Sequence, residues 1–159
     1  MQSILLQNGV GGIDPGKNGG IANIVGSQSS ARKMPPTERD VCDLLENMIV
    51  SGVEKFYIER VASMPGQGVA SSFKFGVSYG TLRGMLIALK IPFEEVTPRK
   101  WQKGIGIKAR DKNESKTEFK NRLKAKAQQL FPHINMTLAN CDAILIAEYG
   151  RRFELGLIK

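Results

Sequence analysis

The sequence is poor in the residues that build metal sites from nitrogen and sulfur. Its 159 residues include one histidine and two cysteines, Cys42 and Cys141, with no CxxC or CxxH spacing. This scarcity argues against a structural zinc site. The two cysteines could form one bridge, but their apolar surroundings favour buried thiols in an intracellular chain. We therefore expect a cytoplasmic protein.

A long apolar run is also missing. No stretch of about 18 apolar residues exists, so we expect neither a membrane span nor a membrane partner. The first seven residues lack a basic region, and a signal peptide is not expected. The length and the 42% hydrophobic content predict one globular domain over 1–159. That length is too short for the two lobes of an actin-like ATPase, so we expect no nucleotide cofactor.

Acidic residues are outnumbered, at 15 against 23 basic ones, which gives a net charge of +8. The segment 99–126 accounts for this excess with eleven basic and three acidic residues. A charge so localised is typical of a phosphate-binding surface, although a solvated helix face would explain part of it. We expect the DNA-binding residues to be Arg99, Lys100, Lys103, Lys108, Arg110, Lys112 and Lys116.

Hydrophobic periodicity and turn residues predict an alternating α/β order. Strands are expected within 4–13 and over 21–25, 32–34, 55–59 and 93–96. Helices are expected over 37–50, 70–89, 98–103, 115–130 and 140–152, with Thr37 and Thr97 as N-caps. This order fits a five-stranded mixed sheet with helices on both faces.

Three carboxylates would meet at one edge of such a sheet if the strands that carry the first two are neighbours, a condition that periodicity alone does not establish. Asp14 and Glu59 end apolar strands, and Asp142 begins an apolar helix. Strand ends of an α/β sheet face the crevice where ligands bind. Oxygen-only ligation favours Mg²⁺ or Mn²⁺ over Zn²⁺. Each residue also has a plainer interpretation: a turn former, a strand-end charge and a first-turn helix charge.

Three glycines recur every four residues in the predicted helix 70–89, at Gly76, Gly80 and Gly84. Each costs roughly 1 kcal/mol of helix stability relative to alanine. Close backbone contact would offset that cost, either at a dimer interface or against the protein's own sheet. Trp101, the single tryptophan, is interpreted as a core anchor rather than a base-stacking platform.

The order and spacing of several motifs resemble the RuvC-type Holliday-junction resolvases, and most closely their phage and prophage branch. These motifs are Gly12-Ile13-Asp14-Pro15-Gly16, Ile58-Glu59-Arg60-Val61, Met64-Pro65-Gly66-Gln67-Gly68, Phe73-Lys74-Phe75-Gly76, Tyr79-Gly80, Thr97-Pro98-Arg99-Lys100-Trp101, Asp142-Ala143 and Ala147-Glu148-Tyr149-Gly150-Arg151-Arg152. The resemblance covers nearly the whole chain.

The resemblance implies a ribonuclease H-like fold, a homodimer and Mg²⁺-dependent nicking of four-way DNA junctions, with Mn²⁺ as a substitute ion. In that family Asp14, Glu59 and Asp142 would be the catalytic metal ligands. Lys103, or Lys100, and Lys116 would lie near the scissile phosphate. A phage-encoded protein would act in the cytoplasm of a bacterial host.

The chain departs from the family pattern at one position. Many relatives carry a fourth acidic residue or a histidine three positions before the last aspartate, where this chain has Ala139. Two alternatives therefore stay open. The chain could bind branched DNA with weak or no catalysis, or it could be a ribonuclease H-like nuclease on RNA–DNA hybrids or flaps.

Overall fold

Five strands form one mixed sheet in the computed structural model, which describes residues 8–62 and 65–159. The strands are β1 (Gly9–Asp14), β2 (Gly20–Val25), β3 (Gln28–Lys33), β4 (Val53–Glu59) and β5 (Phe93–Val96). Their order is β3-β2-β1-β4-β5, with β1 at the centre. The β1–β2 and β2–β3 pairs are antiparallel, and the β1–β4 and β4–β5 pairs are parallel. The predicted mixed sheet is confirmed.

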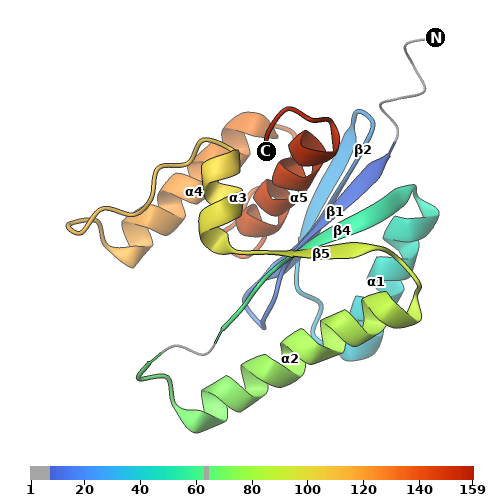
Figure 1. Ribbon diagram of the computed structural model, residues 1–159, viewed down its shortest axis with the longest axis horizontal. Helices are drawn as coiled ribbons and strands as arrows, with labels where there is room; N and C mark the ends of the chain where they lie inside the picture. Colours follow the sequence, from blue (N-terminus) through green and yellow to red (C-terminus); the bar gives the residue numbers. More distant parts are fainter. Residues whose placement is uncertain (1–7, 63–64) are drawn as a thin grey trace.

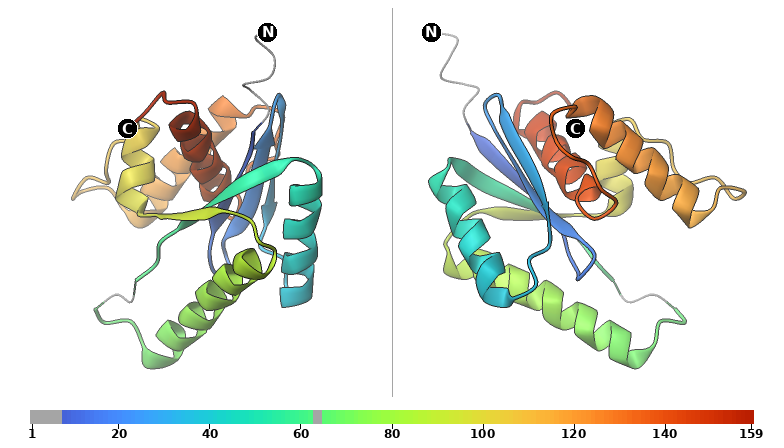
Figure 2. Two further views of the ribbon diagram at one scale, coloured as in Figure 1. Left: turned by 45° about the vertical axis from the view of Figure 1, so that its right-hand side comes forward. Right: turned by 180° about the vertical axis from the view of Figure 1, so that it is seen from behind.

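In the described part of the chain, five helices cover the two faces of this sheet (Figure 1). They are α1 (Glu38–Val50), α2 (Val69–Ala88), α3 (Pro98–Gly104), α4 (Lys116–Leu130) and α5 (Cys141–Glu154). The views in Figure 2 place α1 and α2 on one face and α3, α4 and α5 on the other. The prediction of helices on both faces is therefore confirmed.

Local signals in the sequence set most helix starts. Thr37 and Thr97 each accept a backbone N–H through their side chains at the starts of α1 and α3. Ser115 and Glu118 form a capping box at the start of α4. These contacts satisfy N–H groups that the first turn of a helix leaves without partners. The predicted N-caps at Thr37 and Thr97 are confirmed.

The third strand differs from its prediction over 32–34: it begins four residues earlier, at Gln28, and ends at Lys33. The structure makes the turn from Gly26 and Ser27 alone, because Val25 pairs with Gln28 in the β2–β3 register. Gly26 has a φ of +59°, which suits a tight hairpin turn. β3 is an edge strand, so its polar residues tolerate partial exposure and gave no apolar pattern to detect. The predicted start of the first strand, residues 4–7, lies outside the described residues.

Two hydrophobic clusters fill the spaces on either side of the sheet. Alternation along the central strands divides them: Val10 and Tyr57 belong to the cluster beneath α3, α4 and α5, while Ile13 and Ile58 belong to the cluster beneath α1 and α2. Cys141 is buried and Cys42 half-buried, and both are free thiols. Among the described helices, none is both long enough and apolar enough to cross a membrane.

Glycines allow α5 to lie directly on the central strands. A Cβ atom at Gly12 would overlap the Ala143 carbonyl oxygen and the Ala147 backbone nitrogen. A Cβ at Gly20 would meet the backbone of Ala139. Only residues without side chains permit this approach, so Gly12 and Gly20 fix the depth at which the start of α5 reaches the sheet.

The glycines of α2 do not pack against the protein's own sheet, so that alternative from the sequence is wrong. Gly76, Gly80 and Gly84 are exposed, and a Cβ at each would meet nothing within 4 Å. The opposite side of α2 contributes Leu82 and Leu86 to the core. The physical reason is that these two leucines, one turn apart on the opposite side of α2, already supply the contact with the sheet.

Candidate active site

Asp14 and Glu59 lie side by side at one edge of the sheet. β1 and β4 are parallel neighbours in which Ile13 is aligned with Ile58, so the next residue of each strand is its carboxylate. Burial, then the charges of Asp142 and Glu59, raise the pKa of Asp14 from 3.8 to about 8. A charge acts on a pKa only at short range, so Asp142 belongs to the same group.

The third carboxylate comes from the first turn of α5. Asp142 is buried, with a side chain 10% exposed, and Gly12 and Gly20 let its helix approach the end of β1. Asp142 thus lies close enough to Asp14 and Glu59 for its charge to raise the pKa of both, and the role of the three carboxylates as metal ligands stays a prediction.

Trp101 contacts Glu59 from α3. Its indole Nε1 donates a 2.7 Å hydrogen bond to Glu59 Oε2, and the side chain is fully buried. Burial raises the pKa of Glu59 to about 7 against the lowering effect of this bond, and the charge of Asp142 adds to the rise. Trp101 is therefore a core residue, as predicted, and it also fixes one oxygen of Glu59.

Lys120 is the cation at this site, and the sequence analysis did not single it out. Its Nζ donates a hydrogen bond to Asp142 Oδ2 at 2.5 Å, and its charge lowers the pKa of both Asp14 and Glu59. Burial alone would lower the pKa of Lys120, but the charge and hydrogen bond of Asp142 outweigh it and raise that pKa. No signal in the sequence separates Lys120 from the other lysines of α4, because only its contact with Asp142 distinguishes it.

The lysines expected near the scissile phosphate lie elsewhere. Lys103 and Lys116 are exposed, and in the described part of the chain neither figures among the charges acting on Asp14 or Glu59. The Lys100 ammonium lies 5.7 Å from the ring of Phe153, near the end of α5 opposite Asp142. Their catalytic role stays a prediction, and geometry favours Lys120 over them.

The rest of the predicted DNA-binding set lies in the loop before α4, except Arg99, which lies in the first turn of α3. Lys108 pairs with Asp111 at 3.5 Å, and Arg110 donates to the Glu114 carbonyl oxygen. Arg99 and Lys112 are exposed. These residues form a basic surface next to α3 and α4, which is compatible with contact to a phosphate backbone and does not establish it.

A groove of about 1010 Å³ opens beside Asp14. Its walls are the turn between β1 and β2, the segment joining β3 to α1, and one side of α2. Four lysines line it: Lys17, Lys33, Lys74 and Lys120. Three of them lie outside the basic segment 99–126, and sequence analysis missed them because the fold gathers them from separate elements.

The donor chemistry of the three carboxylates suits a hard divalent cation, since buried carboxyls with raised pKa values are stabilised by added positive charge. Their present arrangement is different. Within residues 8–62 and 65–159, no three His, Cys, Asp or Glu side chains form a group that could hold a metal ion. Lys120 instead supplies the positive charge at Asp142. A cation that bound Asp142 Oδ2 would compete with this lysine.

Asn140 does not replace the acidic residue absent at position 139. It is buried, and its amide nitrogen donates to the Ala31 and Asn135 carbonyl oxygens. Its Oδ1 accepts the Thr137 N–H. The amide nitrogen and oxygen of Asn140 thus both make hydrogen bonds that fix the segment before α5, which is a structural role.

Comparisons with known proteins bear on the fold. No protein-family model and no curated protein sequence matches the chain. RuvC of Thermus thermophilus in complex with a Holliday junction substrate is similar in structure, with a TM-score of 0.64 and 14% identity over 95% of this chain and 98% of that chain. Another structure of Thermus thermophilus RuvC gives 0.57 and 16% over the same shares. Identity this low shows a shared fold alone, and the predicted ribonuclease H-like fold is confirmed.

Proposed function

We propose that this chain is a nuclease of the resolvase type that nicks four-way and related branched DNA junctions as a homodimer. The observation that carries the proposal is the meeting of three carboxylates at the end of the central strands, beside a groove lined by lysines. The fold is shared with a RuvC that is bound to a Holliday junction substrate. Asp14, Glu59 and Asp142 would hold Mg²⁺, with Mn²⁺ as a substitute.

The residues of the site have distinct tasks in this proposal. The chemistry that bound ions supply is activation of a water for attack on the phosphate and stabilisation of the leaving oxygen. Asp14, with a pKa of about 8, must release its proton before it ligates a cation at neutral pH. Lys120 holds Asp142 in place until then and would offset negative charge on the phosphate. Trp101 keeps Glu59 oriented.

The test is cleavage of a four-way DNA junction labelled on each strand, in Mg²⁺ and in Mn²⁺. The wild-type protein should produce paired nicks in two opposite strands. The Asp14→Asn and Glu59→Gln variants should lose cleavage and still bind the junction in EDTA, because the basic groove is unchanged. Matched duplex, flap and RNA–DNA hybrid substrates define the substrate class. Cleavage by Asp14→Asn at the wild-type rate would refute the assignment.

The homodimer is supported by the outer side of α2. Gly76, Gly80 and Gly84 share one helical face with four exposed apolar side chains, namely Val69, Phe73, Val77 and Ile87. A helix that is apolar on both sides is normally covered on both. The glycines would let two copies of α2 approach closely, so the dimer alternative for these residues is the one we propose.

One observation favours a second function, binding of branched DNA with little catalysis. Lys120 is hydrogen-bonded to Asp142, and the carboxylates do not form a ligand group as they stand. Junction binding without nicking in either Mg²⁺ or Mn²⁺ would support this function over the first. Cleavage of the junction in either ion would exclude it.

A further inference from the structure

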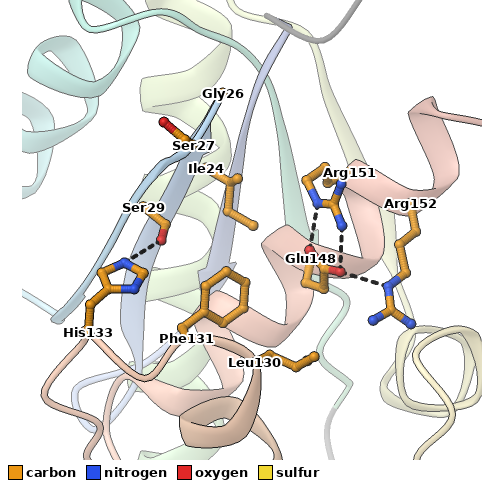
Figure 3. Close-up of a pocket in the computed structure, with 10 residues that line it drawn as sticks. All are labelled: Ile24, Gly26, Ser27, Ser29, Leu130, Phe131, His133, Glu148, Arg151 and Arg152. Carbon is orange, nitrogen blue, oxygen red and sulfur yellow. Dashed lines mark hydrogen bonds and ion pairs between the residues drawn. The ribbon is translucent and has the colours of Figure 1, made fainter.

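A second concave site lies at the opposite end of the sheet from the carboxylates. Ile24 on β2 pairs with Val10 at the start of β1, whereas Asp14 ends that strand. Here the turn between β2 and β3, the end of α4 and the second half of α5 enclose a pocket of about 430 Å³ (Figure 3). The proposed nuclease function makes no use of it.

Two arginines are held in this pocket by a buried carboxylate. Glu148, whose side chain is 4% exposed, accepts two hydrogen bonds from Arg151 at 2.7 and 2.8 Å and one from Arg152 at 2.7 Å. All three residues lie on α5, so this network joins no separate elements. Its physical effect is to fix two guanidinium groups beside the pocket, as Figure 3 shows.

The pocket is positively charged and offers further polar groups. Its lining contains two arginines against one acidic residue, Glu148. Each guanidinium has five N–H donors, of which Glu148 uses two from Arg151 and one from Arg152. The His133 ring makes a 2.9 Å hydrogen bond with Ser29, and Figure 3 shows this pair on the side of the pocket away from the arginines. Guanidinium forks match the oxygens of a phosphate group in geometry and charge.

The remaining wall is apolar. Ile24, Leu130 and Phe131 face the arginines in the view of Figure 3. A pocket that combines one charged side with one apolar side suits a small molecule with a charged end and an apolar body. We propose that this pocket binds a phosphate monoester, with its phosphate on Arg151 and Arg152 and its organic group on the apolar wall.

His133 is the only histidine of the chain, so its ring gives an unambiguous NMR signal inside the pocket. The full-length protein is titrated with deoxyadenosine 5′-monophosphate, inorganic phosphate and deoxyadenosine at constant ionic strength. The monophosphate should shift the ring signals saturably, phosphate should do so at least about tenfold more weakly, and deoxyadenosine should not. An absent shift with the monophosphate, or an equal shift with deoxyadenosine, would overturn the proposal.

Two variants of one residue test the arginine fork. Arg152→Gln should weaken the monophosphate by at least about tenfold, since a hydrogen bond to a charged group is lost. Arg152→Lys keeps the charge and should also bind more weakly, because lysine offers no fork. Arg39→Gln is the matched control, an exposed arginine on α1 on the other face of the sheet, and should bind as the wild type. Wild-type affinity in both folded Arg152 variants would reject the assignment.

Discussion

At the residue scale, the site depends on acidic groups held in an environment that disfavours their charge. Burial is the largest cause of the raised pKa values of Asp14 and Glu59, about 8 and 7. Burying these carboxyl groups lowers the stability of the folded protein, as is common at functional sites. Lys120 relieves part of the repulsion by its contact with Asp142. The residues of the site are therefore stabilised by added positive charge.

The first prediction concerns Asp14→Asn in EDTA. The folded-state pKa of Asp14 lies above its unfolded value of 3.8, so the stabilisation by its neutral form is complete below about pH 4 and is lost as the pH rises through about 8. The variant and the wild type should unfold alike near pH 4. Above pH 8 the variant should be more stable by more than about 1 kcal/mol, measured by urea unfolding. A stability difference that is constant with pH would contradict the burial of Asp14.

The second prediction concerns Lys120→Met, which removes the ammonium and keeps the apolar stem. In EDTA the variant should lose about 1 kcal/mol of stability, because Asp142 loses its partner. Mg²⁺ should then raise its melting temperature by more than it raises that of the wild type, because no lysine competes for Asp142. Lys116→Met, one turn earlier and exposed, is the matched control. Identical responses of the two variants to Mg²⁺ would argue against competition at Asp142.

At the scale of elements, glycines mark two different surfaces: the close contact of α5 with β1, and the open face of α2. Gly12 has no room for a side chain, whereas the α2 glycines have open space around them. The same residue type thus marks a contact already made in one place and a surface left open in the other.

The third prediction tests the α5 contact through Gly12→Ala. The added methyl group would overlap the backbone of Ala143 and Ala147, so α5 must shift and carry Asp142 with it. We expect a loss of about 2 kcal/mol or more in the free energy of unfolding, together with loss of junction cleavage. Gly68→Ala, where a methyl group meets nothing within 4 Å, is the control. Full activity in Gly12→Ala would show that the position of α5 is less constrained than the structure indicates.

The fourth prediction uses Gly80→Ala, with dimerisation measured by sedimentation. Alanine favours the helix by about 1 kcal/mol over glycine, so an isolated chain should gain stability. At a close interface between two α2 helices the same methyl group should weaken the dimer at least about fivefold. Ser71→Ala, exposed on the same helix but on the side that lines the groove beside Asp14, serves as the control. Unchanged dimerisation of Gly80→Ala would place the interface elsewhere.

The sequence predicted those features that are local or follow from strand order. Thr37 and Thr97 are recognisable in the sequence as N-caps, so they predict helix starts. Asp14 and Glu59 are predicted to lie close together because the ends of neighbouring parallel strands lie at the same edge of a sheet. Lys120 was not found, since it is one of several lysines on α4 and only the tertiary contact with Asp142 distinguishes it. The predicted start of β3 is wrong because an edge strand needs no alternation of apolar and polar residues, so its first residues carry no strand pattern.

At the scale of the whole molecule, positive charge is distributed more widely than the basic segment 99–126. Lys17, Lys33 and Lys74 reach the groove beside Asp14 from the β1–β2 turn, β3 and α2. A groove with cations on several walls suits a phosphate backbone that passes the carboxylates. The residues outside segment 99–126 have no net charge in total, but the fold gathers three of their lysines around the groove and makes it locally positive.

The fifth prediction is a change in the salt dependence of junction binding in EDTA. Lys74→Gln removes one groove cation, so affinity should fall and the slope of log K against log salt should decrease by about 0.9. Lys159→Gln, exposed at the chain end and away from the groove lining, should leave the slope unchanged. Binding assays from about 0.05 to 0.2 M salt give both slopes. Equal slopes in the two variants would remove Lys74 from the DNA contact.

The central claim is that Asp14, Glu59 and Asp142 together hold divalent cations. An anomalous difference map from crystals soaked in Mn²⁺ above pH 8 tests it without reference to activity. We predict a peak at bonding distance from all three carboxylates, with Lys120 turned away from Asp142. A map with no peak there, while Lys120 stays on Asp142, would contradict the claim.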